Sequence, residues 1–202
     1  MNPFKITVVS AVALLFGASI AIAQAPPVVR VRATIESVDG SMLTAKSRDG
    51  AEMKIKLVDN APATEVVKAS LADIKPNSYI AVTGMPQPDG SQKAVVVAIF
   101  PEASRGVAEG HHPWDYEPNS TMTNATVDTS VAGVDGQTLT LKYKDGEQKV
   151  MVLPTTMIVA LVKKSVADLK PGQKIVVFAA KKLPDGTLEA PNVQFGDYGV
   201  WR

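Results

Sequence analysis

An internal repeat constrains the fold of this chain more than any other feature of its sequence. Three stretches of the first half recur in the second half, in the same order and at nearly constant spacing, as when "SLADIKPNSYIAV" returns as "SVADLKPGQKIVV". The matched stretches are residues 33–50 with 129–146, 70–82 with 165–177, and 88–100 with 184–196. Chance rarely preserves both order and spacing. The sequence therefore predicts two homologous domains, at residues 28–101 and 123–196.

Each repeat has the pattern of a small β-domain. Residues 30–38 alternate apolar and polar side chains with the period of a half-buried strand. Asp39-Gly40 and Asp49-Gly50 are hairpin turns, since glycine accepts the positive φ that such turns need. The segment "ASLADI" predicts a short helical turn, with Ser70 as its cap and Asp73 completing a capping box. Two more apolar strands follow it.

The order strand-strand-strand, helical turn, strand-strand is that of an OB-type barrel. We therefore predict an all-β fold with short helical turns, made of two tandem five-stranded OB-like barrels. A small open sheet or a sandwich has the same strand count. Closure is favoured because it removes the edge strands that this chain has no other means of covering.

The first residues have the features of an export signal. Lys5 precedes an apolar run over residues 6–23, and the run ends in small residues spaced as Ala-x-Ala. This pattern predicts a signal peptide at residues 1–23 that is cleaved after Ala23, rather than a membrane anchor. The mature protein is then expected in the periplasm or outside the cell, with no membrane span. It contains no cysteine, so its stability must come from packing.

Three short motifs carry a resemblance to a known family. They are a "DG-x-x-L-T-L" hairpin at residues 135–141, "VADLKPGQ" at 166–173, and a closing "DG-x-L-x-A" hairpin at 185–190. With these motifs the chain resembles a family of small exported bacterial OB-like β-domains of unassigned function, present here as a tandem pair. The first repeat departs from the pattern at residues 41–45 and 77–78. The resemblance implies a barrel in the periplasm and no particular reaction.

The linker at residues 102–122 holds both histidines of the chain, in the segment "GHHPWDYEP" at 110–118. Trp114 and Tyr116 lie two residues apart, so they face the same side of an extended segment. Pro113 and Pro118 stiffen its ends. We interpret the segment first as a strap whose two aromatic residues are pressed between the barrels. A partner-binding loop is the alternative.

The same segment also contains residue types that bind metals. His111 and His112, with Glu109 and Asp115, form a set of nitrogen and oxygen donors that suits a divalent transition metal such as Zn or Cu. Adjacent histidines point to opposite sides of an extended chain, however, so one can bind a metal without the other. No other cofactor is expected.

Two further segments allow a structural and a functional interpretation. The apolar run at residues 155–165 predicts a buried strand or helix, with an exposed docking patch as the alternative. The tail at residues 197–202 carries Tyr198 and Trp201, which we expect to fold back against Trp114 and Tyr116. Such an aromatic cluster would be simple packing or a shallow seat for a ligand.

The sequence offers few combinations of residues that could form a catalytic site. Cysteine chemistry is excluded, and a serine triad would have only His111 or His112 as its base. The chain has no G-x-S-x-G motif and no glycine-rich phosphate loop. Its net charge of +1 provides no long-range field for nucleic acid. The sequence does not decide whether the protein is an enzyme, and a hydrolytic enzyme is the least supported alternative.

The function predicted from the sequence is therefore binding. We expect a periplasmic non-enzymatic binding or accessory module that contacts an unknown protein or small ligand through the inter-domain loop, at Trp114, Tyr116, Tyr198 and Trp201. The alternative is a periplasmic protein that binds a divalent metal through the loop at His111 and His112. Nucleic acid is not expected as a partner.

Overall fold

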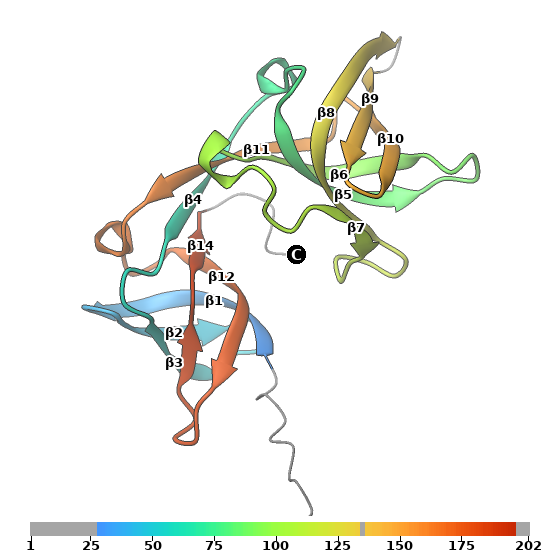
Figure 1. Ribbon diagram of the computed structural model, residues 1–202. Helices are drawn as coiled ribbons and strands as arrows, with labels where there is room; N and C mark the ends of the chain where they lie inside the picture. Colours follow the sequence, from blue (N-terminus) through green and yellow to red (C-terminus); the bar gives the residue numbers. More distant parts are fainter. Residues whose placement is uncertain (1–27, 134–135, 197–202) are drawn as a thin grey trace, which may run out of the picture.

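The computed structural model describes residues 28–133 and 136–196, and this part of the chain is all-β, as the sequence predicts (Figure 1). It contains three single-turn 3-10 helices, and none of the described helices is long and apolar enough to cross a membrane. The strands of the first repeat are β1 (Val28–Asp39), β2 (Met42–Ser47), β3 (Glu52–Leu57), β4 (Ala63–Lys68), β5 (Tyr79–Pro86) and β6 (Gln92–Ile99). The others are β7 (Gly110–Pro113), β8 (Thr121–Gly133), β9 (Gly136–Tyr143), β10 (Gly146–Val152), β11 (Met157–Lys164), β12 (Lys174–Lys182), β13 (Leu188–Ala190) and β14 (Val193–Phe195).

The strands close into two five-stranded barrels. In barrel A the order is β1-β2-β3-β13-β12, and β12 pairs back with β1 to close the ring. In barrel B the order is β8-β9-β10-β6-β5, and β5 pairs back with β8. Each ring contains one parallel pair, β3 with β13 in barrel A and β10 with β6 in barrel B, and its other pairs are antiparallel. This arrangement fits the five-stranded Greek key of the OB type.

The two barrels are not the two repeats. The sequence predicts that residues 28–101 and 123–196 each close a barrel of their own, but each barrel combines three strands of one repeat with two strands of the other. Barrel B is formed by consecutive strands between residues 79 and 152, whereas barrel A joins β1–β3 to β12 and β13. The cause is β4 and its counterpart β11, which leave each barrel as extended strands and carry the chain into the other one.

A short sheet joins the barrels, and Figure 1 shows it between the two lobes. β4 and β11 pair antiparallel, with Val66 opposite Leu161. Each also lies parallel to a strand of the other repeat: β4 lies beside β14, which pairs with β12 of barrel A, and β11 lies beside β6 of barrel B. Val66 and Leu161 are almost fully buried in a small third core. The apolar run at residues 155–165 therefore forms the connecting strand, as the prediction of a buried strand or helix allowed.

Apolar side chains fill the interior of both barrels. Leu43, Ile55 and Phe195 are buried in barrel A, and Leu139 and Leu141 are buried in barrel B. Interiors of this kind are packed to the density of organic crystals and leave no room for a ligand. Binding surfaces must therefore be sought on the outside of the barrels and at their ends.

The predicted capping box forms in both repeats. The backbone N–H of Ser70 donates to the Asp73 carboxylate at 2.8 Å, and the N–H of Ser165 donates to Asp168 at 2.9 Å. Each pair ends the connection that leads from the joining sheet into the next barrel strand. The Ser70 hydroxyl also donates to the Asp73 carboxylate, at 2.7 Å, and this bond together with the one from the N–H lowers the pKa of Asp73.

Candidate functional site

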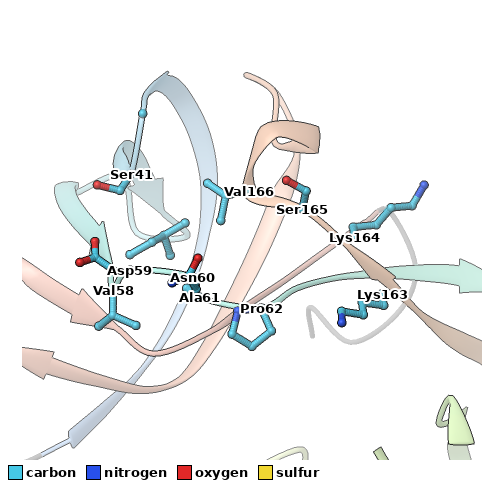
Figure 2. Close-up of a pocket in the computed structure, with 12 residues that line it drawn as sticks. Ser41, Val58, Asp59, Asn60, Ala61, Pro62, Lys163, Lys164, Ser165 and Val166 are labelled. Carbon is cyan, nitrogen blue, oxygen red and sulfur yellow. The ribbon is translucent and has the colours of Figure 1, made fainter. Parts of the chain in front are cut away.

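A pocket opens at one end of barrel A, and Figure 2 shows the side chains around it. Its volume is about 620 Å³. Leu57 and Ala61 lie in its wall and are almost fully buried. Charged and hydroxyl-bearing side chains stand around them. The lining residues with polar side chains are Ser41, Asp59, Asn60, Lys163, Lys164 and Ser165.

Both repeats build this pocket. The β1–β2 turn and the loop over residues 58–62 come from the first repeat, and residues 163–166 come from the second. Alignment of the repeats assigns these loops to different barrels, so the pocket is not predictable from the sequence. The two lysines differ in their partners, because Lys164 pairs with Glu65 at 3.2 Å while Lys163 has no ion pair among the residues with described positions.

Local packing differs at the corresponding end of barrel B. Gly136 of β9 lies so close to β10 that an added Cβ would be 2.3 Å from the carbonyl oxygen of Val152, whereas a Cβ on Gly40 in the β1–β2 turn would meet no atom within 4 Å. The Thr156 hydroxyl also fastens the segment after β10 to β6, since it donates to the carbonyl of Ala94 at 3.2 Å.

The linker between the repeats is fastened to barrel B. Arg105 donates from Nη2 to the carbonyl of Asn77 at 2.8 Å and from Nη1 to the Thr126 hydroxyl at 3.2 Å. The Tyr79 hydroxyl donates to the carbonyl of Val107 at 3.0 Å. These contacts hold the start of the linker against the outer face of β5 and β8.

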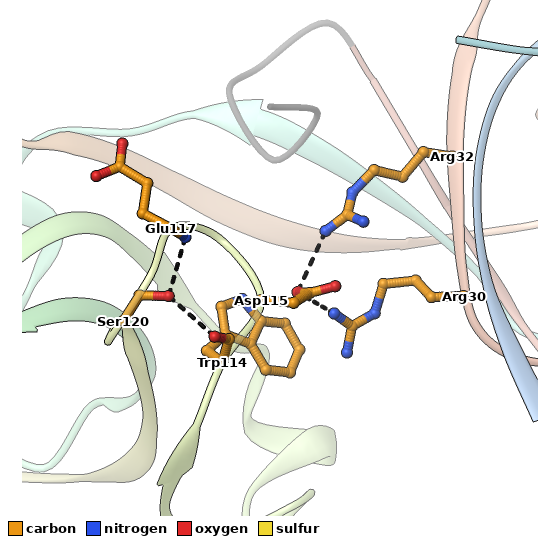
Figure 3. A network of polar contacts seen from close by, with 6 residues as sticks. All are labelled: Arg30, Arg32, Trp114, Asp115, Glu117 and Ser120. Carbon is orange, nitrogen blue, oxygen red and sulfur yellow. Dashed lines mark hydrogen bonds and ion pairs between the residues drawn. The ribbon is translucent and has the colours of Figure 1, made fainter. Parts of the chain in front are cut away.

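The rest of the linker, residues 110–120, forms a structure that we call the strap. β7 pairs with the start of β8, and the backbone N–H of Trp114 donates to the carbonyl of Ser120 at 2.8 Å. Ser120 is buried, and its hydroxyl accepts from the Glu117 N–H while it donates to the Trp114 carbonyl, both at 3.1 Å (Figure 3). The tip of the strap is thus a closed, hydrogen-bonded loop.

The strap docks on barrel A through Trp114. The guanidinium carbon of Arg30, on β1, lies 4.0 Å from the centre of the indole ring. Phe178 of β12 lies beside the same indole, with the ring centroids 6.2 Å apart. Arg30 therefore stands over an aromatic surface contributed by both barrels, a favourable cation–π arrangement. This is the position between the barrels that the sequence interpretation gave to Trp114.

Asp115 adds charge to this contact. Its carboxylate forms an ion pair with Arg30 and a longer one with Arg32, at 3.5 Å (Figure 3). Burial alone would raise the pKa of Asp115, but the two arginines outweigh burial and hold its pKa below the ordinary value. Asp115 is therefore a carboxylate that serves the cross-barrel contact.

The two histidines lie on opposite sides of β7. His111 shares a 2.7 Å hydrogen bond between its Nδ1 and the Thr123 hydroxyl, and its ring stacks near Tyr143. His112 instead meets the edge of Trp114, with ring centroids 6.1 Å apart. Partial burial and the charge of His112 lower the pKa of His111. His111 therefore belongs to the surface of barrel B, and His112 supports the strap.

The four donors proposed for a metal point to different partners. Glu109 accepts from the backbone N–H of Lys144 at 3.0 Å, while Asp115 is bound to Arg30 and Arg32. Within residues 28–133 and 136–196, no three or more His, Cys, Asp or Glu side chains form a group suited to a metal ion. Metal binding by the strap stays a prediction.

The remaining predicted contact residues are less defined. Tyr116 is half-buried in the strap. Tyr198 and Trp201 lie outside the described residues, as does the predicted signal peptide. Phe178 was missed by sequence analysis because an aromatic in an apolar strand is usually core. Its spacing from Lys174 and Val176 could have indicated the outer face of β12.

Comparison with known proteins adds no functional information, since no family model, curated protein or solved structure matches this chain. The resemblance to small exported OB-like domains stays a prediction.

Proposed function

We propose that this protein is an exported, non-enzymatic binding module that holds a small ligand in the pocket at the end of barrel A. The observation that carries the proposal is the pocket itself, with its apolar wall, its charged rim and its contribution from both repeats. Its volume of about 620 Å³ lies within the usual range for small-molecule sites.

The lining favours a small amphipathic carboxylate. Leu57, Ala61 and Pro62 offer apolar contact for a hydrocarbon part. Lys163 offers a cation with no ion pair in the described chain, and the hydroxyls of Ser41 and Ser165 can donate hydrogen bonds. Asp59 also lines the pocket, so the ligand carboxylate must lie on the side of the lysines. A carboxylate group at the rim with an apolar body against the wall would satisfy both surfaces.

The same lining favours binding over turnover. No histidine lines the pocket, and no hydrogen bond in the described chain joins the hydroxyl of Ser41 or Ser165 to Asp59 or to a lysine. Nucleophilic catalysis by serine needs a base within hydrogen-bond reach. His111 and His112 lie on the strap at barrel B. In this proposal the strap holds the two barrels together, and its contact residues act on each other rather than on the ligand.

Saturation-transfer NMR on the purified protein tests this function, with straight-chain carboxylates from butanoate to decanoate as probes. We expect binding that strengthens with chain length, is weakened in Lys163→Ala and is blocked in Ser41→Trp, where an indole would enter the pocket from an exposed turn. Lys68→Ala is the matched control, because Lys68 occupies the position of Lys163 in the other repeat. Absence of binding, or binding that Lys163→Ala and Ser41→Trp leave unchanged, contradicts the proposal.

A further inference from the structure

A second feature of barrel A lies on its outer wall, away from the pocket. A small hollow of about 180 Å³ crosses β12, β1 and β2. Strand register explains its composition, because Thr34 of β1 lies opposite Lys174 on one side and Lys46 on the other. Directly opposed residues on neighbouring strands point to the same face. The lining residues are Arg32, Ala33, Thr34, Lys46, Ser47, Arg48 and Lys174.

The hollow is strongly cationic. Four of its lining side chains carry positive charge, and no carboxylate lines it. Arg32 has the only ion pair among these four in the described chain, the long contact with Asp115 at 3.5 Å. Its Nε is buried without a hydrogen-bond partner. Since like charges gathered on one sheet face are unfavourable, a bound anion would relieve a repulsion that the fold itself creates.

Nearby carboxylates do not neutralise this group. Asp49 accepts a short hydrogen bond from the Ser47 hydroxyl, which lowers the pKa of Asp49 and keeps the carboxylate in its own turn. Glu52 of β3 lies opposite Lys46 and therefore points to the same face, but it does not line the hollow, and it forms no ion pair with Lys46.

The spacing suits an oxyanion. Lys46 and Lys174 are two strands apart, about 9.6 Å in a regular sheet. Two flexible lysine side chains can converge over that distance on one tetrahedral anion above the Thr34 hydroxyl. Arg32 presents a planar group with several donors, which matches phosphate and sulfate oxygens.

In barrel B the surface that corresponds to the hollow is neutral and is covered by the linker. There Thr126 takes the position of Thr34, opposite Lys142 and Tyr79. Lys142 pairs with Asp128 at 3.1 Å, and the Thr126 hydroxyl accepts from Arg105 of the linker. Barrel B thus fills this position with its own chain, whereas the side chains of Lys46, Arg48 and Lys174 in barrel A are exposed.

We propose that this hollow is an oxyanion site that binds a phosphate or sulfate group through Arg32, Lys46, Arg48 and Lys174, with the Thr34 hydroxyl at its centre. The group is a free ion or part of a larger anionic molecule. The site is separate from the pocket and does not depend on the function proposed for it.

Two-dimensional amide NMR of the purified protein tests the site, with inorganic phosphate, sulfate and tripolyphosphate titrated against sodium chloride at equal ionic strength. We expect saturable shifts confined to residues 32–34, 46–48 and 174. The variant Lys46→Gln/Lys174→Gln should weaken binding by at least about tenfold, since two charge-assisted hydrogen bonds are lost. Lys142→Gln in barrel B is the matched control and should bind normally.

The probes also distinguish the two sources of the anion. Binding of phosphate or sulfate supports a site for the free ion, and binding of tripolyphosphate alone supports a group carried on a larger molecule. The inference is overturned if chloride reproduces the shifts, if the shifts spread over all exposed lysines, or if Lys46→Gln/Lys174→Gln binds like the parent. Carboxylate binding in the pocket should persist in this double variant. The oxyanion site and the carboxylate pocket are therefore tested independently of each other.

Discussion

Trp114 is the aromatic residue through which the strap contacts barrel A. Its indole lies beside Arg30 and Phe178 and forms a T-shaped pair with His112. We expect Trp114→Ala to lower the free energy of unfolding by about 2 kcal/mol, less than for a fully buried tryptophan because Trp114 is half-buried. Urea denaturation measures the change.

Val107→Ala is the control for this variant, since Val107 belongs to the same linker and is 52% exposed. Its effect should stay within about 0.5 kcal/mol. If Trp114→Ala proved equally neutral, the strap would not stabilise the two-barrel arrangement.

Asp115 gives the strap a defined dependence on pH. Its pKa is lower in the folded protein than in the unfolded chain, so the ion pairs with Arg30 and Arg32 stabilise the fold above the unfolded value of about 3.9. We expect Asp115→Asn to cost about 1 kcal/mol or less at neutral pH, because the carboxylate is half exposed to solvent. The difference from the parent should vanish as the pH falls through the lowered folded pKa. A difference that grows toward low pH would contradict this assignment, and parallel urea titrations from pH 7 to 2.5 measure it.

The metal hypothesis is tested at the same residues. Metal binding would raise the melting temperature of the chelated protein when Zn or Cu is added, and His111→Ala/His112→Ala would abolish the rise. Because the two imidazoles lie on opposite sides of β7 and Asp115 is bound to arginines, we expect no rise in the parent. A rise of several degrees in the melting temperature that disappears in the double variant would support the metal site instead.

At the scale of elements, the joining sheet of β4 and β11 is the feature on which the architecture depends. Leu161 is 7% exposed and packs in the small core with Val66 between the barrels. We expect Leu161→Ala to lower the free energy of unfolding by about 2–3 kcal/mol, the low end for buried leucine because this core is small. Differential scanning calorimetry should also show a broader or divided transition, since the barrels would be less firmly coupled.

Val162 provides a control on the same strand. Its side chain points to the other face and is 39% exposed. Val162→Ala should change stability by well under 1 kcal/mol and leave a single transition. Equal effects of the two substitutions would show that the joining sheet does not couple the barrels.

Local structure in this chain was predictable because its causes are local. The turns at Asp39-Gly40 and Asp49-Gly50, the alternation from Arg30 and the Ser70–Asp73 cap depend on residues within a few positions of one another. The two turns and the cap form, and the alternation holds from Arg30 to Ile35, where a bulge interrupts it. The pairing of β1 with β12 has no local cause. Both repeats offer a closing pair of strands with nearly the same pattern, and periodicity cannot tell which copy a strand will meet.

The candidate sites were missed for the same reason. The pocket and the cationic hollow each combine residues from both repeats, such as Ser41 with Lys163 and Thr34 with Lys174. Alignment of the repeats assigns such residues to separate domains. The contact of Trp114 could be predicted because its own segment has the signature of a packed loop, but its partners Arg30 and Phe178 could not.

At the scale of the whole molecule, the exchange of strands decides which fragments can fold. Residues 69–160 contain every strand of barrel B and the residues of its core, from Ala69 to Ile158. We expect this fragment to be a folded monomer, with a β-type circular dichroism spectrum and cooperative unfolding. Residues 28–101 are a complete sequence repeat but lack β12 and β13, which pair with β1 and β3. We expect that this fragment does not fold as a monomer.

Light scattering combined with circular dichroism separates these outcomes. A stable monomeric barrel from residues 28–101 would contradict the exchanged topology. A folded pair of such fragments would agree with it, because each copy could supply the strands that the other lacks.

The exchange also fixes the order in which the molecule can be completed as it is synthesised. The strands of barrel B are consecutive in the chain, so that barrel can close once β10 has been made. β1, β2 and β3 are made first, yet they must wait for β12 and β13, on the order of ten seconds at ordinary synthesis rates. For that interval β1–β3 lack β12 and β13, the strands that pair with both of their edges in the folded protein. A truncation just before β12 would therefore leave β1–β3 without the strands that complete barrel A, whereas all the strands of barrel B would still be present.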